Sequence, residues 1–523
     1  MEEKIAKRIA ELREAKAKAL LGGGQEKIDK IHAQGKLTAR ERIERLLDPK
    51  SFIESNLLYG HLKGQMGDGI ITGHGTIDGR KVFIYSQDTT VQGGSIGGIH
   101  GYKMYKTLER ALEMRVPFIG LHDSPGARVP RPEEGHMALG DVYSEKSGGS
   151  LFFPNTHASG AIPQISAILG SCAGISVYSP ALTDFILMVD KQSHMFITGP
   201  RMVKSVMSED ISAEELGGAQ VHCTTSGVAD LRVANEDECF TKIRELISFL
   251  PDNCEQMPPY VDTKDDPERI DDSLAEIIPP DPNQSYDIKE IIKRIVDHGH
   301  FLEIKPEFAP EMVVGFGRLD GSTVGIVANQ PLFLAGSLTV DGSDKQARFM
   351  RFCDCFNIPI ILLIDTPAYM PGSWQEHLGI IRHGAKVLYA LCEATVPRIS
   401  IQLRKAYGGG NLGMGVIPGM GTDLVYSWPI AEMGVIGAEQ SVDLFYAAQI
   451  KKAENPQEFK QQLIKQYAER YSNPIYEASN NWFMEDIIEP RETRRLLIKA
   501  LNMLRTKKKV YPRYGKKHGN IPL

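Results

Sequence analysis

The chain has 523 residues, of which 42% are hydrophobic and 24% are charged, so it can bury a large core. A single core stops growing at roughly 250–300 residues, and this length therefore predicts two domains. The formal net charge of -6 excludes the strongly basic surface of a nucleic-acid-binding protein, and no nucleic acid partner is expected.

The first 50 residues are predicted to form helices that are interrupted at Gly22–Gly24. Thr38 can cap a helix, and Glu41 three positions later completes a capping box. The N-terminal helix interleaves its charges and lacks the apolar core of a signal peptide. No apolar stretch approaches the roughly 18 residues that span a bilayer. We therefore expect a cytoplasmic protein.

The seven cysteines are scattered along the chain and odd in number, which favours a reduced protein without a disulfide framework. Cys353 and Cys355 form the closest pair, but their spacing is too short for a usual zinc site and no second pair lies nearby. We interpret them as buried thiols and predict no metal site.

Short apolar runs of β type alternate with helical runs after residue 50, as in Gly101–Met114 followed by Val116–His122. This alternation indicates an α/β fold. A polar stretch rich in Pro and Asp, residues 256–284, has little to bury and is predicted to be a linker. It separates an N-terminal domain, 1–255, from a C-terminal domain, 285–523.

The two halves of the chain match one another in a series of short segments that keep the same order. The offset is 242 residues in the first two matches and 234 in the next two, which corresponds to one length change of eight residues between them. The extra length lies in Pro130–Asn155, which is predicted to be a surface excursion. We interpret the chain as a fused duplicate. The matched pairs are Val116–Pro125 with Ile358–Pro367, Gly94-Ser95 with Gly336-Ser337, Ile162–Ser166 with Val396–Ser400, Ala173-Gly174 with Tyr407-Gly408, Thr183-Asp184 with Thr422-Asp423, and His194–Ile197 with Met433–Ile436.

A glycine loop follows a β-like run at matching places in both halves, Gly170–Ser176 in the first and Gly408–Asn411 in the second. Glycine at a strand-to-helix turn lets the backbone approach a ligand, and the first amides of a helix point outward without partners. Such N–H groups can hold a developing oxyanion, an interaction worth about 3–4 kcal/mol per donor.

Such glycine loops have two other common uses. Phosphate binding is disfavoured because neither loop has the order G-x-x-x-x-G-K-[ST] or a good G-x-G-x-x-G pattern. Glycines that only permit tight packing are a common alternative for one loop, but less so for loops at matching places in both halves. The duplication favours two oxyanions, from two substrates, in one site.

Several polar residues at strand ends are interpreted as structural. His122 precedes Asp123, but the repeat keeps only the carboxylate, as Asp365, so the histidine is a spectator. His383 lies in a predicted helix, where a structural histidine is the default. No Ser-His-Asp or Cys-His set stands out for nucleophilic catalysis.

The loops and many shorter motifs resemble the carboxyltransferase family of biotin-dependent enzymes, the β subunits of propionyl-CoA carboxylase and their decarboxylase relatives. The matches run through nearly the whole chain and are very specific as a set. They include Lys36–Ile43, Gly93–Ser95, Asp123–Arg128, Val177–Asp184, Met195–Pro200, Glu215–Ala219, Asn329–Pro331, Ile380–Lys386, Glu393–Pro397 and Arg404–Gly408.

The resemblance implies two tandem crotonase-like domains related by duplication, with acyl-CoA bound by the first and biotin by the second. It also implies a homo-hexamer whose active sites each combine the first half of one subunit with the second half of another. Carboxybiotin would release CO2, the biotin enolate would take the acyl α-proton, and the thioester enolate would attack CO2. The same steps run backward give decarboxylation.

The resemblance also implies roles for individual residues. The N–H groups of Gly174 and Ile175 would hold the thioester oxygen, and those of Gly409 and Gly410 would hold the biotin ureido oxygen. The other residues implied in substrate binding are Gly408, Asn411, Leu412, Ala173, Gly94, Ser95, Gly126 and Ala127.

Two residues depart from the usual family pattern. Ile175 stands where the family usually has glycine, so it would act through its backbone and shape the acyl pocket. Leu412 stands where propionyl-type enzymes have Asp, and its Gly-Asn-x-Gly-Met context resembles methylcrotonyl- or geranyl-type enzymes. We expect the acyl specificity of the protein to depend on these two positions.

Neither a Met-Lys-Met biotinylation site nor an ATP-grasp region is present. The biotin is therefore expected on a partner, the biotin carboxyl carrier protein, together with biotin carboxylase or a membrane decarboxylase subunit. A methylmalonyl- or glutaconyl-CoA type decarboxylase is one alternative. A crotonase-like hydratase or hydrolase is another, although it would need only one oxyanion loop, and a non-enzymatic scaffold is the third.

Overall fold

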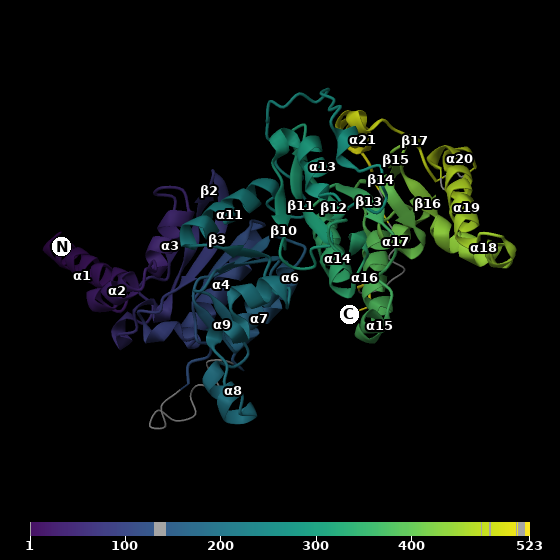
Figure 1. The fold of residues 1–523 in the computed structure, drawn as a ribbon. Helices are drawn as coiled ribbons and strands as arrows, with labels where there is room; N and C mark the ends of the chain where they lie inside the picture. Colours follow the sequence, from purple (N-terminus) through teal and green to yellow (C-terminus); the bar gives the residue numbers. More distant parts are fainter. Residues whose placement is uncertain are drawn as a thin grey trace. The chain divides into compact units, whose positions relative to one another are not determined.

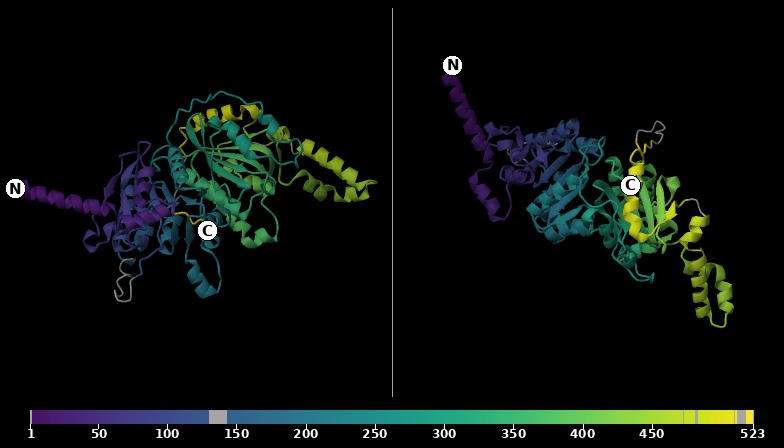
Figure 2. Two further views of the ribbon diagram at one scale, coloured as in Figure 1. Left: turned by 60° about the vertical axis from the view of Figure 1, so that its left-hand side comes forward. Right: turned by 90° about the horizontal axis from the view of Figure 1, so that it is seen from above.

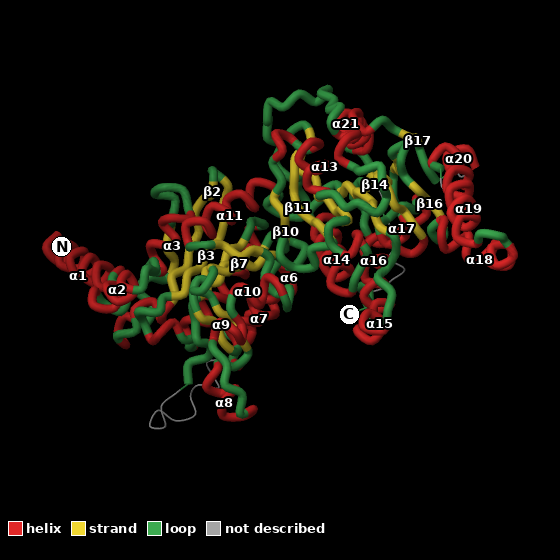
Figure 3. Tube along the Cα trace, in the orientation of Figure 1, coloured by secondary structure: helices red, strands yellow, loops and turns green. Residues whose placement is uncertain are grey.

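The computed structural model describes residues 2–129, 143–471, 473–480, 483–508, 510 and 518–522. The chain divides into two compact units, Met1–Gln256 and Met257–Leu523. Each unit is a mixed β-sheet flanked by helices (Figures 1 and 3). This α/β arrangement agrees with the alternation that the sequence predicts.

The sheet of the first unit begins antiparallel and continues parallel. Its strands are β1 (Ile53–Ser55), β2 (Ile70–Ile77), β3 (Arg80–Gln87), β4 (Phe118–His122), β5 (Gln164–Ile168), β7 (Phe185–Val189) and β9 (Leu231–Val233), and a separate pair is β6 (Ser171–Ala173) and β8 (His194–Phe196). The order is β1-β2-β3-β4-β5-β7-β9, antiparallel up to β3 and parallel beyond it. The carboxyl ends of the parallel strands therefore share one edge of the sheet.

The helices of the first unit begin with an exposed pair. They are α1 (Glu2–Leu20), α2 (Gln25–Ala33), α3 (Ala39–Leu46), α4 (Gly98–Met114), α6 (Phe152–Ala158), α7 (Ile175–Ala181), α8 (Pro200–Met207), α9 (Ala213–Gly217), α10 (Ala219–Thr224) and α11 (Glu236–Phe249). Helix α1 extends away from the rest of this unit in every view (Figures 1 and 2). The predicted interruption at Gly22–Gly24 is confirmed, and so is the capping box, in which the Glu41 N–H donates to Thr38 Oγ1 at 3.3 Å.

The second unit repeats this order of strands. Its strands are β10 (Leu302–Ile304), β11 (Met312–Leu319), β12 (Ser322–Asn329), β13 (Ile360–Thr366), β14 (Arg398–Tyr407), β15 (Leu424–Ser427), β16 (Glu432–Gly434) and β17 (Asp486–Ile487). They follow the order β10-β11-β12-β13-β14-β15-β17, and β16 pairs with the end of β14. Here too the first strands are antiparallel and the later ones parallel.

The helices of the second unit cover its sheet and extend to a C-terminal group. They are α12 (Leu274–Ile277), α13 (Ile288–Ile295), α14 (Val340–Cys355), α15 (Ser373–Leu378), α16 (Ile380–Glu393), α17 (Gly408–Gly413), α18 (Ala438–Lys452), α19 (Pro456–Tyr471), α20 (Pro474–Asn480) and α21 (Thr493–Leu504).

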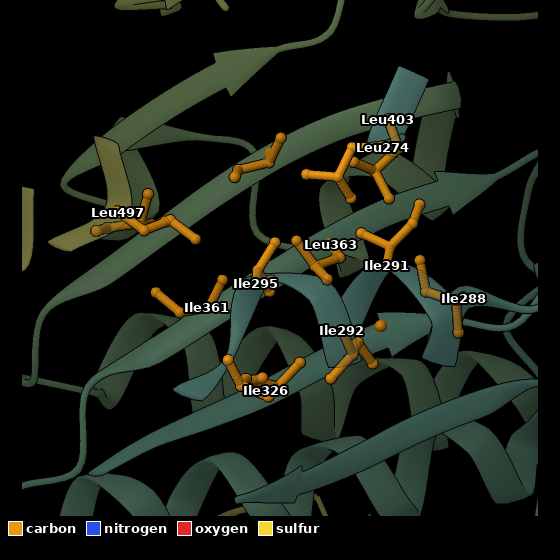
Figure 4. Close-up of a cluster of buried hydrophobic side chains, with 14 of the residues drawn as sticks. Leu274, Ile288, Ile291, Ile292, Ile295, Ile326, Ile361, Leu363, Leu403 and Leu497 are labelled. Atoms are coloured by element: carbon orange, nitrogen blue, oxygen red, sulfur yellow. The ribbon is translucent and has the colours of Figure 1, made fainter. Parts of the chain in front are cut away.

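The core of the second unit shows why its sequence folds this way. Helix α13 carries isoleucines at 288, 291, 292 and 295, which is the i, i+3, i+4, i+7 spacing of one helical face. These side chains are fully buried and pack over Ile326, Ile361 and Leu363 of the sheet (Figure 4). Burial of each such side chain contributes about 1.5–3 kcal/mol.

The internal repeat of the sequence is a repeat of hydrogen bonds as well. The Gln164 N–H donates to Asp184 Oδ2 at 2.8 Å, and the Arg398 N–H donates to Asp423 Oδ2 at 2.8 Å. One detail of the sequence alignment is wrong by one residue. Ser171 of β6 lies opposite His194 and Lys405 of β14 lies opposite Glu432, so the residue that corresponds to His194 is Glu432 and not Met433.

The polar stretch 256–284 is packed on the second unit. Leu274 and Ile278 belong to the buried core of that unit. We accordingly propose to place the domain boundary at 256/257, where the two compact units divide. Of the surface excursion expected over 130–155, residues 130–142 lie outside the described part of the chain.

The structure also bears on the cysteines and on membrane and metal binding. Cys353 is buried but Cys355 is exposed, so the interpretation of this pair as two buried thiols is wrong for Cys355. Among the residues that the structure describes, none of the helices combines the length and apolar character needed to cross a bilayer. Over the same residues, no cluster of His, Cys, Asp and Glu side chains is arranged to hold a metal ion.

Candidate active-site loops

The first glycine loop is a sharp turn between β6 and α7. Gly174 has φ 59° and ψ -125°, a conformation that glycine adopts without a steric penalty. Its N–H donates to the carbonyl oxygens of Ile197 at 3.0 Å and Phe196 at 3.2 Å, which continues the pairing of β6 with β8. The Gly174 N–H that the sequence analysis expects at the thioester oxygen is therefore already engaged by the protein.

The next two amides of the first loop are the ones without a partner. Ile175 and Ser176 open α7, and their N–H groups donate to no acceptor among the described residues. The turn below them is fixed, because Ser176 Oγ accepts from the Ala173 N–H at 2.9 Å and donates to the Ser124 carbonyl at 3.0 Å. The loop thus presents two outward N–H groups on a rigid support.

The second loop has the same construction at the end of β14. Gly408 has φ 48°, and a Cβ atom there would lie 2.6 Å from the Val435 carbonyl oxygen, so only glycine fits. Gly409 and Gly410 follow in the first turn of α17, and their N–H groups find no acceptor in the described parts of the chain. This loop therefore also presents adjacent outward amides.

A second turn approaches the first loop within the same unit. Gly126, at φ 101°, comes so close that a Cβ atom would lie 2.5 Å from the Ala173 carbonyl oxygen and 3.9 Å from the Ile175 nitrogen. Ala127 lies beside Ile96 in an isolated bridge, with the Ile96 N–H donating to the Gly126 oxygen at 2.8 Å. The structure thereby brings Gly126 to the first loop and Ala127 beside Ile96, and their role in substrate binding stays a prediction.

Gly94 and Ser95 support this turn from the other side. A Cβ atom on Gly94, which has φ 72°, would lie 2.7 Å from the Asp123 carbonyl oxygen. Ser95 is buried, and its hydroxyl donates to the Gln92 oxygen and accepts from Arg128 Nε at 3.1 Å. Its side chain therefore holds the turn, so a role in substrate binding would fall to its backbone.

Asn411 and Leu412 are the residues of α17 after Gly410 that the sequence analysis expects to bind substrate. Asn411 accepts a hydrogen bond from Gln402 Nε2 at 3.4 Å, so its side chain is oriented by the strand below it. Leu412, the fifth residue of α17, is 40% exposed. The Leu412 side chain is therefore accessible to a neighbouring group.

The two strand-end aspartates anchor the loops. Asp123 pairs with the buried Arg42 at 3.2 Å, and Asp365 pairs with Arg404 at 3.0 Å. Burial raises the pKa of both carboxyl groups, and the guanidinium groups oppose that rise. Burial also lowers the pKa of His122 to about 3, so its imidazole is neutral. These groups are structural, as the sequence analysis interprets them.

The sequence analysis missed one polar set in the first unit. His194 Nδ1 lies 3.1 Å from Ser171 Oγ, and His194 Nε2 lies 3.2 Å from Glu214 Oε2. Ser171 is exposed at the start of β6, and Glu214 is on α9. The three residues are far apart in sequence, and only the pairing of β6 with β8 brings the first two together.

Comparison with known proteins shows the family to which the chain belongs. Residues 30–521 match the model of the carboxyl transferase domain. The chain belongs to the carboxyl transferase family. It is 48% identical to the carboxyltransferase subunit of propionyl-CoA carboxylase from Haloferax mediterranei, and 46% identical to the α subunit of methylmalonyl-CoA decarboxylase from Veillonella parvula, each over 99% of both chains.

The fold agrees with this family. A crystal structure of the transcarboxylase 12S hexamer core, with methylmalonyl-coenzyme A and methylmalonic acid bound, superposes with a TM-score of 0.92. It is 43% identical to this chain and covers 99% of it, and the match takes in 98% of the transcarboxylase chain. The protein is thus an acyl-CoA carboxyltransferase subunit of the biotin-dependent carboxylases and decarboxylases, built from two crotonase-like domains.

Proposed function

We propose that this carboxyltransferase moves a carboxyl group between N1-carboxybiotin on a partner carrier and the α, or vinylogous, carbon of an acyl-CoA. The observation that carries the proposal is the pair of strand-to-helix turns, one in each unit, whose first helical amides lack protein acceptors. Each turn suits an oxygen that becomes negative during the reaction.

In the first unit, the donors that support the proposal are the N–H groups of Ile175 and Ser176. The sequence analysis expects the N–H groups of Gly174 and Ile175 as the donors. Because the Gly174 N–H is bonded to the Ile197 carbonyl, the donor pair is Ile175 and Ser176 instead. These amides would hold the thioester oxygen as the α-proton leaves and the enolate forms. A loop on a rigid support needs little reorganisation as that charge develops.

In the second unit, Gly409 and Gly410 offer the corresponding N–H groups. A ureido carbonyl oxygen fits such donors because it accepts hydrogen bonds and needs no cation. Biotin bound there would supply the carboxyl group and a base for the acyl α-proton. Gly408 allows the tight turn, and Leu412 would contact the neighbouring acyl group.

The partners and assembly follow from the same proposal. The biotin would be carried by a biotin carboxyl carrier protein, with biotin carboxylase or a membrane decarboxylase subunit completing the enzyme. We further propose a homo-hexamer, since the similar transcarboxylase core is described as a hexamer. A cytoplasmic location is in keeping with the scattered cysteines. Propionyl-CoA and methylmalonyl-CoA are the substrates that we would test first, because the names of two relatives contain them.

Replacement of Ile175 by proline tests the first loop, because it removes one N–H while proline is tolerated at the first helical position. We expect Ile175→Pro to lower kcat for carboxyl exchange between methylmalonyl-CoA and free biotin by about 10²–10³-fold. Ile175→Val keeps the N–H and serves as the control. Equal rates for the two variants would remove Ile175 from the oxyanion site.

The matched experiment in the second loop uses Gly409→Pro and Gly409→Ala. A Cβ atom on Gly409 would lie 3.5 Å from the Tyr369 ring, so alanine fits without a clash and retains the N–H. Proline removes the N–H within the first turn. We expect only the proline variant to lose exchange with biotin, again by about 10²–10³-fold. Unchanged exchange would show that our placement of the biotin site is wrong.

Thioester hydrolysis is a second candidate function, and the set Ser171, His194 and Glu214 favours it. Ser171 Oγ would attack the thioester carbonyl while His194 takes its proton and passes it to the departing CoA thiolate. Water would then release the acid from the serine. Hydrolysis of methylmalonyl-CoA without biotin, lost in Ser171→Ala, would support this function. Hydrolysis that survives in that variant would rule out this set.

A further inference from the structure

A cavity of about 590 Å³ lies in the second unit, at the edge of the sheet where its parallel strands begin. Its walls include the turn between β11 and β12, Pro359 and Pro397 just before β13 and β14, and α21 with the chain after it. The second glycine loop follows the far end of β14. The ten residues of that strand therefore separate the loop from the cavity by roughly 30 Å.

The inner walls of the cavity are apolar. Leu319, Val324 and Ile498 are buried residues of the core of this unit, and Leu501 and Leu504 of α21 are half-buried beside them. Small-molecule sites are typically about 300–1,000 Å³ in volume and mostly apolar, with a few polar groups that orient the ligand. The cavity thus has the size and the lining to bury an aliphatic chain.

The first unit closes the corresponding edge of its sheet with an arginine. Arg80 begins β3 directly after the turn from β2, and Ser322 begins β12 in the same way. Arg80 Nε donates to Asp252 Oδ1 at 3.0 Å, which holds the chain after α11 against the sheet. Helix α11 follows the last strand of its sheet, as α21 does in the second unit. Ser322 is too short to make this contact, and it lines the cavity instead.

A second arginine of the first unit also corresponds to a shorter residue of the second. Arg115, with φ 57°, and Asn357, with φ 56°, each follow a long helix and stand two residues before a proline. Arg115 pairs with Glu255 at 3.0 Å, again in the chain after α11. Asn357 lines the cavity. The cavity therefore occupies space that larger side chains and their partners take up in the first unit.

The charged side chains around the cavity favour an anion on the side of α21. Arg505 and Lys508 are exposed on the chain that follows this helix. Lys507 between them is already engaged, because its Nζ donates to Asp423 Oδ2 at 2.7 Å. Asp320, a carboxylate in the wall, belongs to the turn between β11 and β12. Arg505 and Lys508 thus present two cationic groups beside the apolar walls.

We propose that this cavity binds an aliphatic carboxylate, with its hydrocarbon chain along Leu319 and Leu501 and its carboxylate at Arg505 and Lys508. Burial of the chain supplies affinity, and the cationic groups select an ionised head group over a neutral one. Because the cavity lies at the opposite edge of the sheet from the second loop, this ligand would bind without displacing biotin. The site is independent of carboxyl transfer, since it belongs to the second unit alone.

Isothermal titration calorimetry of the full chain with octanoate and with octanamide tests the choice of ligand. We expect octanoate to bind about tenfold more tightly, because hydrogen bonds to an ionised carboxylate are charge-assisted. The double variant Arg505→Gln, Lys508→Gln should raise the Kd for octanoate about tenfold and leave that for octanamide unchanged. Lys465→Gln, at an exposed site of α19, is the control and should change neither Kd.

Ser322→Arg tests the place of binding, because it gives the second unit the residue that the first unit has there. The longer side chain would occupy the cavity, so we expect the Kd values for octanoate and octanamide both to rise at least about tenfold. Ser479→Arg, at an exposed site of α20, should leave both unchanged. A circular dichroism spectrum like that of the wild type shows that Ser322→Arg is folded. If it does not fold, the double variant still decides.

Four results would overturn the proposal. They are a wild-type protein without saturable octanoate binding, equal Kd values for octanoate and octanamide, unchanged binding in folded Ser322→Arg, and displacement of CoA by octanoate. The last would place octanoate at the acyl-CoA site. If octanoate does not bind and Ser322→Arg changes the oligomeric state measured by light scattering, the cavity is filled by a second copy of the chain instead.

Discussion

Gly174 and Gly408 occupy equivalent turns, with φ of 59° and 48°, and neither position tolerates a side chain without strain. These two glycines allow the backbone to make the sharp turn into the helix. The groups that can contact a substrate oxygen are the amides of the residues after them, where the helix begins. A residue with a side chain, such as Ile175, can therefore stand at a donor position in the first unit.

Leu412 provides a prediction about substrate choice. It is 40% exposed and directly follows Asn411 in the second loop. We expect Leu412→Asp to disfavour apolar acyl groups beside it and to lower kcat/KM for longer acyl-CoA relative to propionyl-CoA by about tenfold. A panel of CoA esters measures this, with Leu412→Met as the control. An unchanged order of preference would exclude the residue from acyl recognition.

Lys345 provides a prediction about pH. Its ammonium group is buried and donates to the Lys305 and Phe308 carbonyls at 2.7 Å each, and burial lowers its pKa to about 7 from 10.5. The unfolded chain therefore binds more protons than the folded chain between those two values. Wild-type stability should consequently rise with pH across this window.

The variant Lys345→Met isolates that effect. We expect the difference in free energy of unfolding, wild type minus variant, to increase from pH 7 toward pH 10.5, measured by urea denaturation. Lys465→Met, at an exposed site, should show no such trend. A difference that is flat with pH would mean that burial does not lower the pKa of Lys345.

At the scale of secondary-structure elements, the strand ends are joined by a buried ion pair. Asp365 lies near the end of β13 and accepts from Arg404 of β14 at 3.0 Å, with both side chains at most 7% exposed. Asp365→Ala would leave the guanidinium without its charge partner, at a cost of about 3–5 kcal/mol in free energy of unfolding.

The exposed pair of Arg351 and Glu393 supplies the comparison for Asp365. Its side chains are 39% and 38% exposed, and Glu393→Ala should cost at most about 1 kcal/mol. Urea denaturation of both variants measures the contrast. If the two variants lose the same stability, the Asp365 pair does not anchor the loop.

The strands and glycine turns could be predicted from the sequence because their signals are local. Apolar runs and glycines recur at fixed offsets, and the structure has strands β4 and β13 at the matched segments. The engaged Gly174 N–H could not be predicted in this way. It depends on the register between β6 and β8, which are separated by a helix and another strand. The same register places His194 beside Ser171.

At the scale of the whole molecule, each compact unit contains one glycine loop. A single reaction can use both loops only if the acyl-CoA at the first loop and the biotin at the second come together in one site. The resemblance to the carboxyltransferase family implies that they meet between subunits, the first half of one with the second half of another. The loop variants described above make this arrangement testable without any structural measurement.

Mixed oligomers of Ile175→Pro and Gly409→Pro subunits should recover activity that neither variant has alone. A site between subunits can draw its first loop from the Gly409→Pro chain and its second from the Ile175→Pro chain, and both of these loops are intact. Random mixing of equal amounts would restore about one quarter of the wild-type rate, because each site draws its two loops independently. The measurement is exchange between methylmalonyl-CoA and biotin after the two proteins are unfolded and refolded together. Wild-type protein taken through the same procedure controls for refolding. If the mixture is no more active than the separate variants, both loops of a site belong to one chain.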